Sequence, residues 1–446
     1  MVSCSTEKPG FTGAKGEVKL ITLDPGHFHA ALVQKTMYSQ IDSNVAVYAP
    51  ESDDVKEHLN RISGYNQRPE NPTRWNENVY IGADYFEKML QEKKGNVVVI
   101  AGNNKKKTEY IKAAVEAGFN VLSDKPMAIN AVAFEQLKDA FRLAQEKGVL
   151  LYDIMTERNE ITTIMQKEFS LLPEVFGTLE KGTLENPAVT KESVHHFYKF
   201  VSGAALKRPA WFFDVEQQGE GIVDVTTHLV DLVQWECFPE KIIDYTNEIT
   251  IDKAKHWSTS LTPSQFNEVT KLGDYPEYLI KDVNDSVLSV YSNGEINYTI
   301  KGVHAKVSVI WNYKAPEGAG DTHFSIMRGT KANLIIRQGE AQGFKPTLYI
   351  EPVAGTDTAL FAQTLASELK KIQAKYEGIE LKKLDNTWEV VVPEKYKVGH
   401  ESHFAQVMEK YLQYLIDGKL PDWEVPNMLA KYFTTTKALE LARSEK

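Results

Sequence analysis

The chain has 446 residues, which is enough for two or three domains with a sizeable core. Hydrophobic (42%) and charged (25%) residues occur in the proportions usual for a globular protein, and the net charge of −10 argues against a nucleic-acid-binding protein, whose surface would be basic. The sequence has no run of 18 or more apolar residues, so we expect no membrane-spanning helix.

The first four residues, MVSC, resemble the end of a bacterial lipoprotein signal, in which a small residue precedes a cysteine and a polar linker follows. We therefore expect residues 1–16 to be a flexible tether with a lipid anchor at Cys4, on a periplasmic or membrane-anchored protein. If Met1 is instead the native start, the protein is cytoplasmic and has a frayed N-terminus. The other cysteine, Cys237, lies in an apolar helical segment and is expected in the core.

Residues 17–152 alternate between short apolar, β-branched runs and segments with helical spacing of apolar residues. Strands are expected at 18–23, 44–49, 96–102, 119–126 and 148–155, and helices at 30–40, 53–62, 84–92, 108–118 and 131–148. Strands that are buried on both faces and separated by helices predict a parallel, doubly wound α/β domain. The Pro- and Asn-rich segment 64–75 is expected to be a loop.

Residues 153–446 show a different pattern, typical of an α+β domain. After a helix at 159–172, alternating strands are expected at 193–202, 286–302, 304–315, 323–339 and 347–353, with hairpin turns at SNGE (292–295) and RGTKAN (328–333). This run predicts a large, mostly antiparallel sheet with one open face. A helix and a hairpin should follow at 357–395, and helices at 402–418 and 426–446 should close the chain.

The turn after the first strand carries an unusual sequence, LDPGHFHAAL (23–32). A strand followed by a helix is the setting of a G-x-G-x-x-G phosphate-binding turn, in which backbone N–H groups and the positive helix end hold a pyrophosphate. Here the six positions from Asp24 to His29 keep only the middle glycine, Gly26. By itself, the segment fits an ordinary strand-to-helix corner better than a phosphate-binding turn.

Two later segments carry a family resemblance. Residues 98–130 contain a strand, an Asn-containing loop, a helix ending in EAG and a strand that leads to Asp124-Lys125-Pro126. Residues 217–238 contain a glycine-rich turn that leads to Asp224 and His228. In order and spacing, these segments resemble the glucose–fructose oxidoreductase/inositol dehydrogenase (Gfo/Idh/MocA) family across residues 17–240.

The resemblance implies a Rossmann-like domain that holds NAD or NADP, and a C-terminal sheet that faces the substrate or the partner subunit of a homo-oligomer. The implied reaction is reversible hydride transfer between the nicotinamide and a secondary alcohol of a sugar, glycoside or cyclitol. The implied catalytic residues are Lys125, Asp224 and His228. The implied cofactor-binding residues are Gly26, His27, Phe28, His29, Gly102, Asn103, Asn104, Asp124, Lys125 and Pro126.

The chemistry of the three catalytic candidates agrees with these roles. Asp224 and His228 are spaced i, i+4, so on a helix they would share one face. Histidine titrates near neutrality and can take a proton from an alcohol, while the ammonium of Lys125 can stabilise negative charge on the oxygen. Taken singly, Lys125 is better explained as a surface lysine, Asp224 as a member of a helix ion pair and His228 as a core histidine. Only the joint pattern of the three residues favours a catalytic site.

Two cofactor contacts depart from the family pattern. The acid that binds the adenosine ribose should end the second strand, and Glu51 is the cofactor-binding candidate there, although the proline before it displaces it. The lysines at 105–107 fit a solvated helix start better than a phosphate clamp. The histidines at 27 and 29 would crowd the pyrophosphate or the nicotinamide, which suggests a cofactor that stays bound.

The substrate-binding candidates lie in the C-terminal domain. Besides Asp224 and His228, they are Lys207, Arg208, Trp211 and His323. The cations offer hydrogen-bond donors and the indole offers a flat face for a sugar ring, although a loop packed on the sheet is an equal alternative. His195 and His196 alternate on a strand, so we expect one of them to face the site. His400 and His403 lack a third ligand in the sequence, and we predict no metal site.

Two other functions stay open. The protein could be a surface-anchored carbohydrate-binding protein whose cofactor-binding fold has lost its function. This would account for the missing glycines of the turn after the first strand and for the displacement of Glu51. Elimination from a glycoside through a keto intermediate would use the same residues as hydride transfer.

Overall fold

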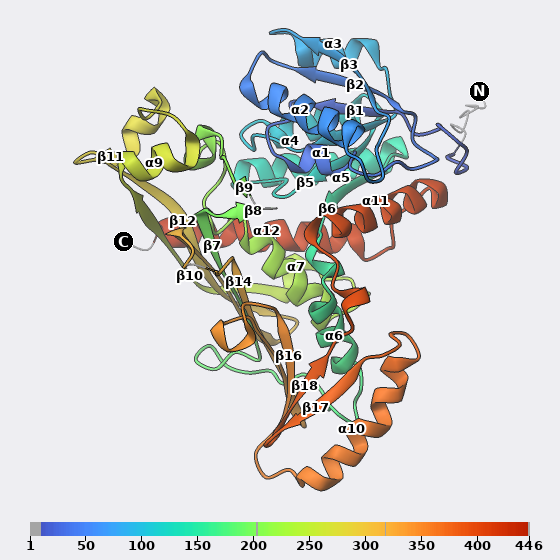
Figure 1. Cartoon of the computed structure of the whole chain (residues 1–446), viewed down its shortest axis with the longest axis vertical. Coiled ribbons are helices and arrows are strands. Elements are labelled where there is room, and N and C mark those ends of the chain that lie inside the picture. The colour runs from blue at the N-terminus through green and yellow to red at the C-terminus, as the bar shows by residue number, and fades with distance from the viewer. Residues whose placement is uncertain (1–9, 202–203, 317, 445–446) are drawn as a thin grey trace. The chain divides into compact units, whose positions relative to one another are not determined.

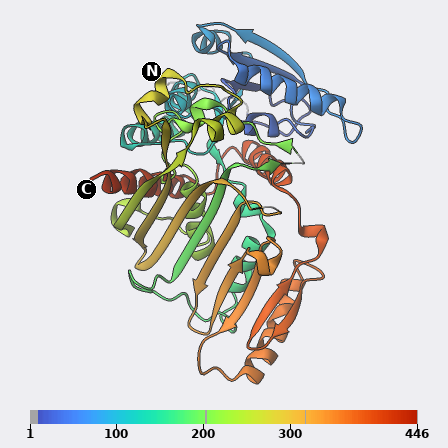
Figure 2. The same ribbon diagram turned by 60° about the vertical axis from the view of Figure 1, so that its left-hand side comes forward.

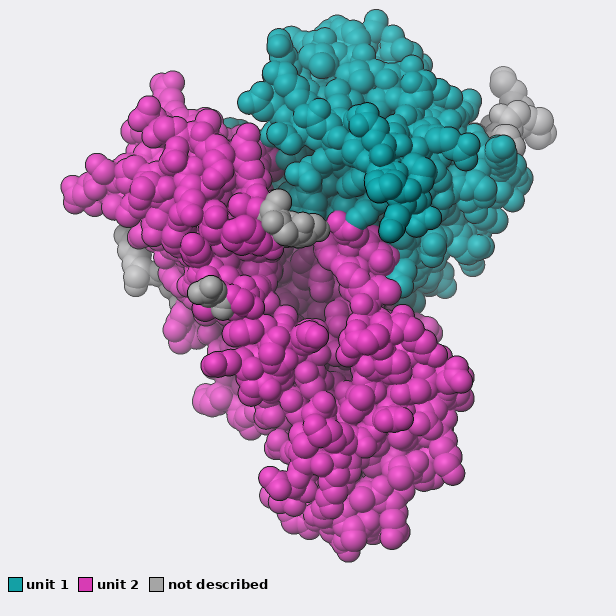
Figure 3. Space-filling view, in the orientation of Figure 1, with its two compact units in different colours: residues 1–127, 135–154, 404–425 teal, residues 128–134, 155–403, 426–446 magenta. Residues whose placement is uncertain are grey.

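The computed structural model describes residues 10–201, 204–316 and 318–444. Cys4 and the first nine residues of the expected tether lie outside the described residues. The chain divides into two compact units, which Figure 3 colours separately. Unit 1 comprises residues 1–127, 135–154 and 404–425, and unit 2 comprises residues 128–134, 155–403 and 426–446.

Unit 1 therefore includes a segment from near the C-terminus, whereas the sequence predicts a single change of domain near residue 152. Residues 404–425 carry most of helix α11 (His400–Asp417), whose Phe404, Met408 and Tyr411 are buried. The ring of Tyr411 stacks on that of Tyr152, with 6.1 Å between their centroids. Apolar burial thus joins this late helix to the first domain.

Unit 1 contains a six-stranded sheet whose recorded pairs are all parallel (Figure 1). Its strands, in spatial order, are β3 (Asn76–Ile81), β2 (Asn44–Ala49), β1 (Leu20–Leu23), β4 (Val97–Ile100), β5 (Asn120–Asp124) and β6 (Leu151–Ile154). The predicted parallel α/β domain is confirmed. Strand β3 was not predicted, because it is an edge strand with no buried residue and its sequence, NENVYI, is half polar.

The helices of the first domain follow the predicted order. They are α1 (His29–Leu32), α2 (Asp53–Gln67), α3 (Tyr85–Glu92), α4 (Lys107–Glu116) and α5 (Ala131–Lys147). The predicted helix over 30–40 is wrong in length, because α1 is a single turn and residues 33–40 form turns and bends. The strand order reverses between β1 and β4, and in such sheets ligands bind at the carboxyl ends of the strands beside this point.

Unit 2 contains a ten-stranded sheet, whose strands lie side by side in Figure 2. Along the sheet they are β10 (Ile249–Leu261), β12 (Val287–Ile300), β13 (Val303–Lys314), β7 (Val189–Tyr198), β14 (Thr322–Arg328), β15 (Ala332–Arg337), β16 (Thr347–Pro352), β18 (Thr387–Val391) and β17 (Glu380–Leu384), and β11 (Val283–Asn284) pairs with β12. The sheet is mostly antiparallel, as predicted, although β7 and β13 run parallel.

One predicted hairpin is confirmed and one is wrong. RGTKAN joins β14 to β15, but SNGE lies inside the continuous strand β12. Gly294 serves packing there, since a Cβ at this position would lie 2.6 Å from the side chain of Ile222. The glycine thus marks a close approach to a neighbouring segment.

Helices cover one face of this sheet. Helix α6 (Ile161–Ser170) packs on β15 and β16, and α7 (Thr226–Cys237) packs on β13 and β7. The remaining helices of unit 2 are α8 (Tyr245–Glu248), α9 (Pro263–Thr270), α10 (Thr358–Gln373) and α12 (Glu424–Ser444). Cys237 is partly buried against the core, as expected. Across the described ranges, we find no helix with the length and apolar character needed to span a membrane.

Candidate functional site

The turn after β1 keeps the backbone conformation of a glycine-rich phosphate-binding turn, although aspartate replaces the first glycine of the G-x-G-x-x-G pattern. Asp24, at that position, has φ of +46°, a left-handed conformation that aspartate tolerates better than most residues. Its Oδ2 accepts hydrogen bonds from the hydroxyls of Tyr110 (3.2 Å) and Tyr85 (3.4 Å). Burial raises the pKa of Asp24 above its ordinary value.

The turn lies against the loop that follows β4. The backbone N–H groups of Gly26 and His27 both donate to the carbonyl of Ala101, each at 3.2 Å. Gly102 is needed here, because a Cβ on it would lie 2.3 Å from the Asp24 carbonyl oxygen and 2.9 Å from the Gly26 nitrogen. Two backbones thus pack in contact at the point where the strand order reverses, which fits a dinucleotide cradle.

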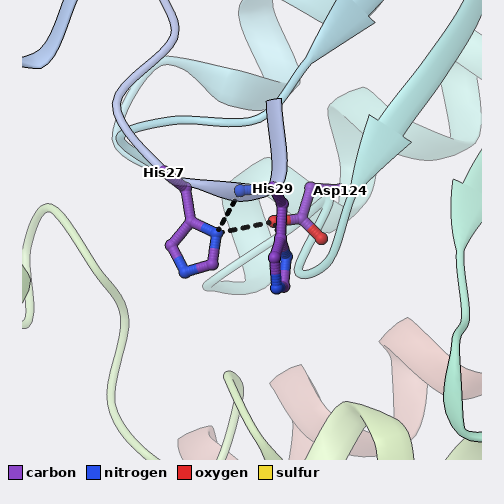
Figure 4. A group of neighbouring side chains, drawn as sticks. All are labelled: His27, His29 and Asp124. Atoms are coloured by element: carbon purple, nitrogen blue, oxygen red, sulfur yellow. Dashed lines mark hydrogen bonds and ion pairs between the residues drawn. The ribbon is translucent and has the colours of Figure 1, made fainter. Parts of the chain in front are cut away.

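Two histidines of this turn contact the end of β5, as Figure 4 shows. Nδ1 of His29 lies 2.9 Å from Oδ2 of Asp124, and Nδ1 of His27 lies 3.5 Å from the same oxygen. The backbone N–H of His29 also donates to Nδ1 of His27 at 3.3 Å. Burial, and then the neighbouring His29, lower the pKa of His27 well below its ordinary value, which favours a neutral imidazole.

Lys125 follows Asp124 directly and is partly exposed, and its peptide bond to Pro126 is cis. Its backbone N–H donates to Oδ1 of Asp124 at 2.9 Å. The expectation of a solvated lysine run is wrong for Lys107, which is 1% exposed and donates to the Asp124 carbonyl oxygen at 3.2 Å. Lys105 and Lys106 are exposed, as expected.

The remaining cofactor candidates of unit 1 differ in burial. Asn104 is buried, and Oδ1 of Asn103 accepts from the backbone N–H of Lys105 at 3.0 Å. Phe28 precedes α1, and its ring lies 4.5 Å from that of His27. Glu51, just after β2, is exposed to solvent.

Asp224 and His228 belong to unit 2, but not to one helix as their spacing suggests. Asp224 lies in the turn before α7, and His228 lies in the first turn of that helix. Asp224 is buried and accepts a hydrogen bond from Nε2 of Gln218 at 2.9 Å. The carboxylate is therefore held in place by the segment that precedes it.

A glycine fixes the path of this segment. A Cβ on Gly221 would lie 1.7 Å from the carbonyl oxygen of Ser292 on β12, so only glycine fits. The N–H of Gly221 donates to the Tyr291 carbonyl at 3.0 Å, and that of Asp224 donates to the Glu220 carbonyl at 3.0 Å. Sheet contact at Gly221 thus sets the position of Asp224.

Arg208 is 7% exposed and lies among aromatic rings of unit 2. Its guanidinium carbon lies 4.5 Å from the ring centroid of Phe212 and 5.0 Å from that of Trp311, and the side chain donates to the carbonyls of His196 and Phe197. Burial lowers its pKa to about 10, although the charges of Asp321 and Asp224 act in the opposite direction.

The other substrate candidates lie in different surroundings. Lys207 is exposed, and Trp211 is buried in the cluster that contains Phe197 and Phe213. His323 is on β14, and its Nε2 is buried without a hydrogen-bond partner among the described residues. Burial, and then the charge of Lys191, lower its pKa to about 3.

Sequence reasoning missed Asp321, whose carboxylate contacts three side chains. Its Oδ2 lies 3.0 Å from Nδ1 of His195 and contacts Nζ of Lys199, and its Oδ1 lies 3.3 Å from Nδ1 of His196. Both histidines therefore reach one carboxylate, where strand alternation predicted that only one would face the site. Burial alone would raise the pKa of Asp321, but these partners hold it well below its ordinary value.

Comparison with known families assigns both parts of the chain. Residues 26–153 match the family model described as "Oxidoreductase family, NAD-binding Rossmann fold", and residues 165–443 match "Putative oxidoreductase C terminal domain". The chain belongs to the Gfo/Idh/MocA oxidoreductase family. It is therefore an oxidoreductase with an NAD-binding Rossmann fold, and its cofactor is NAD or NADP.

Solved structures agree with this family. A crystal structure of a "putative oxidoreductase" from Parabacteroides merdae is 60% identical, covers 98% of this chain and 100% of that one, and has a TM-score of 0.97. A "putative oxidoreductase" of Thermotoga maritima is 14% identical, with 96% of this chain and 99% of that chain covered, and has a TM-score of 0.61. Levoglucosan dehydrogenase in complex with NADH and levoglucosan is 12% identical, with 96% of this chain and 98% of that chain covered, and has a TM-score of 0.60. No curated protein matches the sequence.

Membership of the Gfo/Idh/MocA family confirms the predicted fold, cofactor class and enzyme class. It favours the oxidoreductase over the surface-anchored carbohydrate-binding protein. The cradle at Gly102 and the left-handed Asp24 fit a dinucleotide turn, so the missing glycines do not remove its backbone geometry.

Proposed function

We propose that this oxidoreductase transfers hydride reversibly between NAD(P) and a secondary alcohol of a sugar, glycoside or cyclitol. The observation that carries the substrate class is the polar cluster of unit 2. The side chains of His195, Asp321 and Lys199 are 22%, 23% and 24% exposed, and His195 stacks on Trp311 with ring centroids 5.0 Å apart. Several hydrogen-bonding groups beside flat rings suit a polyhydroxylated ring better than an apolar alcohol.

Each catalytic candidate has a separate role. His228 would take the hydroxyl proton as the alcohol is oxidised and return it on reduction. Lys125 would stabilise negative charge on a substrate oxygen, and Asp224, held by Gln218, would orient the substrate hydroxyl or the imidazole. When bound, the nicotinamide accepts or supplies the hydride. Relatives support the substrate class, since levoglucosan dehydrogenase was crystallised with levoglucosan.

The cofactor would be held by the turn at Gly26 to His29, by the loop at Gly102 to Asn104, and by Asp124 to Pro126. The N–H groups of Gly26 and His27 donate to the Ala101 carbonyl, so this turn would contact the cofactor mainly through the bulky side chains of His27, Phe28 and His29. We infer a tightly held cofactor. Its retention through dialysis, measured by mass spectrometry of the denatured protein, supports this inference, and its loss contradicts it.

Two further features stay predictions. A homo-oligomer is implied only by the family resemblance, and light scattering of the purified protein would measure it. A lipid anchor at Cys4 and a periplasmic location rest on the sequence alone. Metabolic labelling with a fatty acid, with Cys4→Ser as the control, would test the anchor.

The activity itself is tested with glycosides and inositols, watched at 340 nm for reduced nicotinamide. At least one member of the panel should be oxidised by the wild type. Lys125→Ala and His228→Ala should lower that rate by about two to four orders of magnitude while the far-ultraviolet circular dichroism is unchanged. Wild-type rates in both variants would refute the assigned roles.

A further inference from the structure

We propose that His27, His29 and Asp124 bind one divalent transition-metal ion, for which Zn²⁺ is the probe. The proposed function assigns these three residues only to the segments that hold the cofactor, so a metal site goes beyond it. In the part of the chain that the structure describes, this is the one group of three His, Cys, Asp or Glu side chains whose donor atoms lie close enough to hold a metal ion.

The three side chains come from neighbouring strand ends of unit 1. His27 lies in the turn after β1, His29 is the first residue of α1, and Asp124 is the last residue of β5. Parallel strands place their carboxyl ends at one edge of the sheet, which is why residues so distant in sequence meet here. Figure 4 shows both imidazoles on one side of the Asp124 carboxylate.

The distances are close to those of a metal site. One donor atom from each side chain lies within 4.8 Å of the other two. Nδ1 of His29 and Nδ1 of His27 lie 2.9 and 3.5 Å from Oδ2 of Asp124. Ligands about 2.0 Å from a tetrahedral ion are separated from one another by about 3.3 Å, so small side-chain rotations suffice.

The surroundings hold these ligands in place. The rings of His27 and His29 lie 4.0 Å apart at 78°, and the ring of Phe404 lies 4.6 Å from that of His29. Oδ1 of Asp124 accepts from the Lys125 N–H, which turns the other oxygen toward the histidines. The side chains of His27, His29 and Asp124 are 23%, 9% and 4% exposed, so an ion could enter past His27.

The ligand set selects the class of ion. Two imidazoles and one carboxylate suit Zn²⁺ and similar transition metals, whereas Mg²⁺ and Ca²⁺ prefer all-oxygen sites. The ammonium of Lys107, held at the Asp124 carbonyl, adds positive charge that opposes any cation, so binding here depends on the two imidazole ligands. A cation bound at Nδ1 of His29 would replace the hydrogen bond between this nitrogen and Asp124, and the proton of the neutral imidazole would then lie on Nε2.

The test needs no substrate, and it is made on protein freed of bound dinucleotide, because the turn at His27 and His29 is also assigned to the cofactor. Full-length, tag-free protein is treated with chelator, incubated with ZnCl₂ and desalted, and zinc is measured by elemental mass spectrometry. Wild type should retain about one zinc per chain, and Co²⁺ in its place should give visible ligand-field bands. His27→Ala, at the most exposed of the three ligands, should retain less than about a tenth as much while its circular dichroism matches wild type.

His400→Ala is the matched control, because His400 belongs to the other histidine pair that the sequence offers and its side chain is 40% exposed. It should bind zinc like wild type. The proposal is overturned if wild type retains no zinc, if folded His27→Ala retains it, or if His400→Ala loses it. A failure here leaves the hydride transfer intact, because that reaction is measured separately at 340 nm.

Discussion

Arg158 and Asp231 form a double hydrogen bond in the core of unit 2, with Nε–Oδ2 and Nη2–Oδ1 distances of 2.7 Å. Nζ of Lys431 lies 2.9 Å from Oδ1 of the same aspartate. Asp231 is three residues after His228 on α7, so this cluster anchors the helix that carries the proposed acid/base. Burial alone would raise the pKa of Asp231, but Arg158 and Lys431 hold it below its ordinary value.

Asp231→Ala should therefore destabilise unit 2 strongly. The change leaves two buried cations without their shared carboxylate, which typically costs about 3–5 kcal/mol. Urea unfolding measures the loss. Glu440→Ala, which breaks the exposed Lys437–Glu440 pair on α12, is the control and should cost less than about 1 kcal/mol. Equal effects of the two substitutions would contradict the anchoring role.

Asp24→Ala should destabilise unit 1 by about 2–3 kcal/mol, because alanine strains the left-handed backbone and the Tyr85 and Tyr110 hydroxyls lose their shared acceptor. Asp24→Asn should cost less than about 1 kcal/mol, since asparagine tolerates this conformation and keeps an acceptor oxygen. Thermal unfolding monitored by circular dichroism distinguishes them. An alanine variant as stable as the asparagine variant would refute this explanation of the turn.

His58 in α2 should make the wild type less stable in acid. Both of its ring nitrogens are buried without a hydrogen-bond partner in the described ranges, and burial lowers its pKa to about 4. Because the pKa of His58 is lower in the folded state than in the unfolded state, the free energy of unfolding has its full value above pH 6.5. It decreases as the pH falls from 6.5 toward 4, where the unfolded state binds the proton more readily. The loss between pH 7.5 and 5 should be about 2 kcal/mol.

His58→Leu should abolish this loss and should add about 1 kcal/mol at pH 7.5, because no polar nitrogen is then buried unpaired. Denaturant titrations at the two pH values test both statements. His304→Leu, at a partly exposed histidine of β13, should leave the pH dependence unchanged. If the acid loss persists in His58→Leu, the assignment to His58 is wrong.

Gly221→Ala should lower kcat/KM by about a hundredfold, since the new Cβ would collide with the Ser292 carbonyl and displace the segment that holds Asp224. Gly273→Ala is matched in chemistry, but its Cβ meets nothing within 4 Å. That variant should keep wild-type kinetics and stability. A normal kcat/KM in Gly221→Ala would show that the position of Asp224 does not matter.

The helices and strands could be predicted from the sequence where their residues are buried, because burial leaves a run or a period of apolar residues. The run VVVI of β4 is buried along its whole length and could be predicted as a central parallel strand, whereas β3 exposes its polar residues at a sheet edge and could not. SNGE was mistaken for a turn because Gly294 is there for contact with Ile222, a partner more than 70 residues away.

The residues of the candidate site could be predicted only where they lie close together in one segment of the sequence. Asp124 with Lys125, and Asp224 with His228, stand close together in the chain, and their joint pattern could be recognised. The contacts of His29 with Asp124 and of His195 with Asp321 join residues 95 and 126 positions apart. Neither contact follows from local periodicity, because the strand order of each sheet creates it.

The most direct test of the account follows the hydride itself. A substrate found in the 340 nm panel is prepared with deuterium at the carbinol carbon and incubated with the wild-type protein and oxidised cofactor. Mass spectrometry of the isolated nucleotide should show one deuterium gained per substrate oxidised, with none gained in the presence of Lys125→Ala over the same time. Oxidised product beside an unlabelled nucleotide would contradict hydride transfer to the nicotinamide.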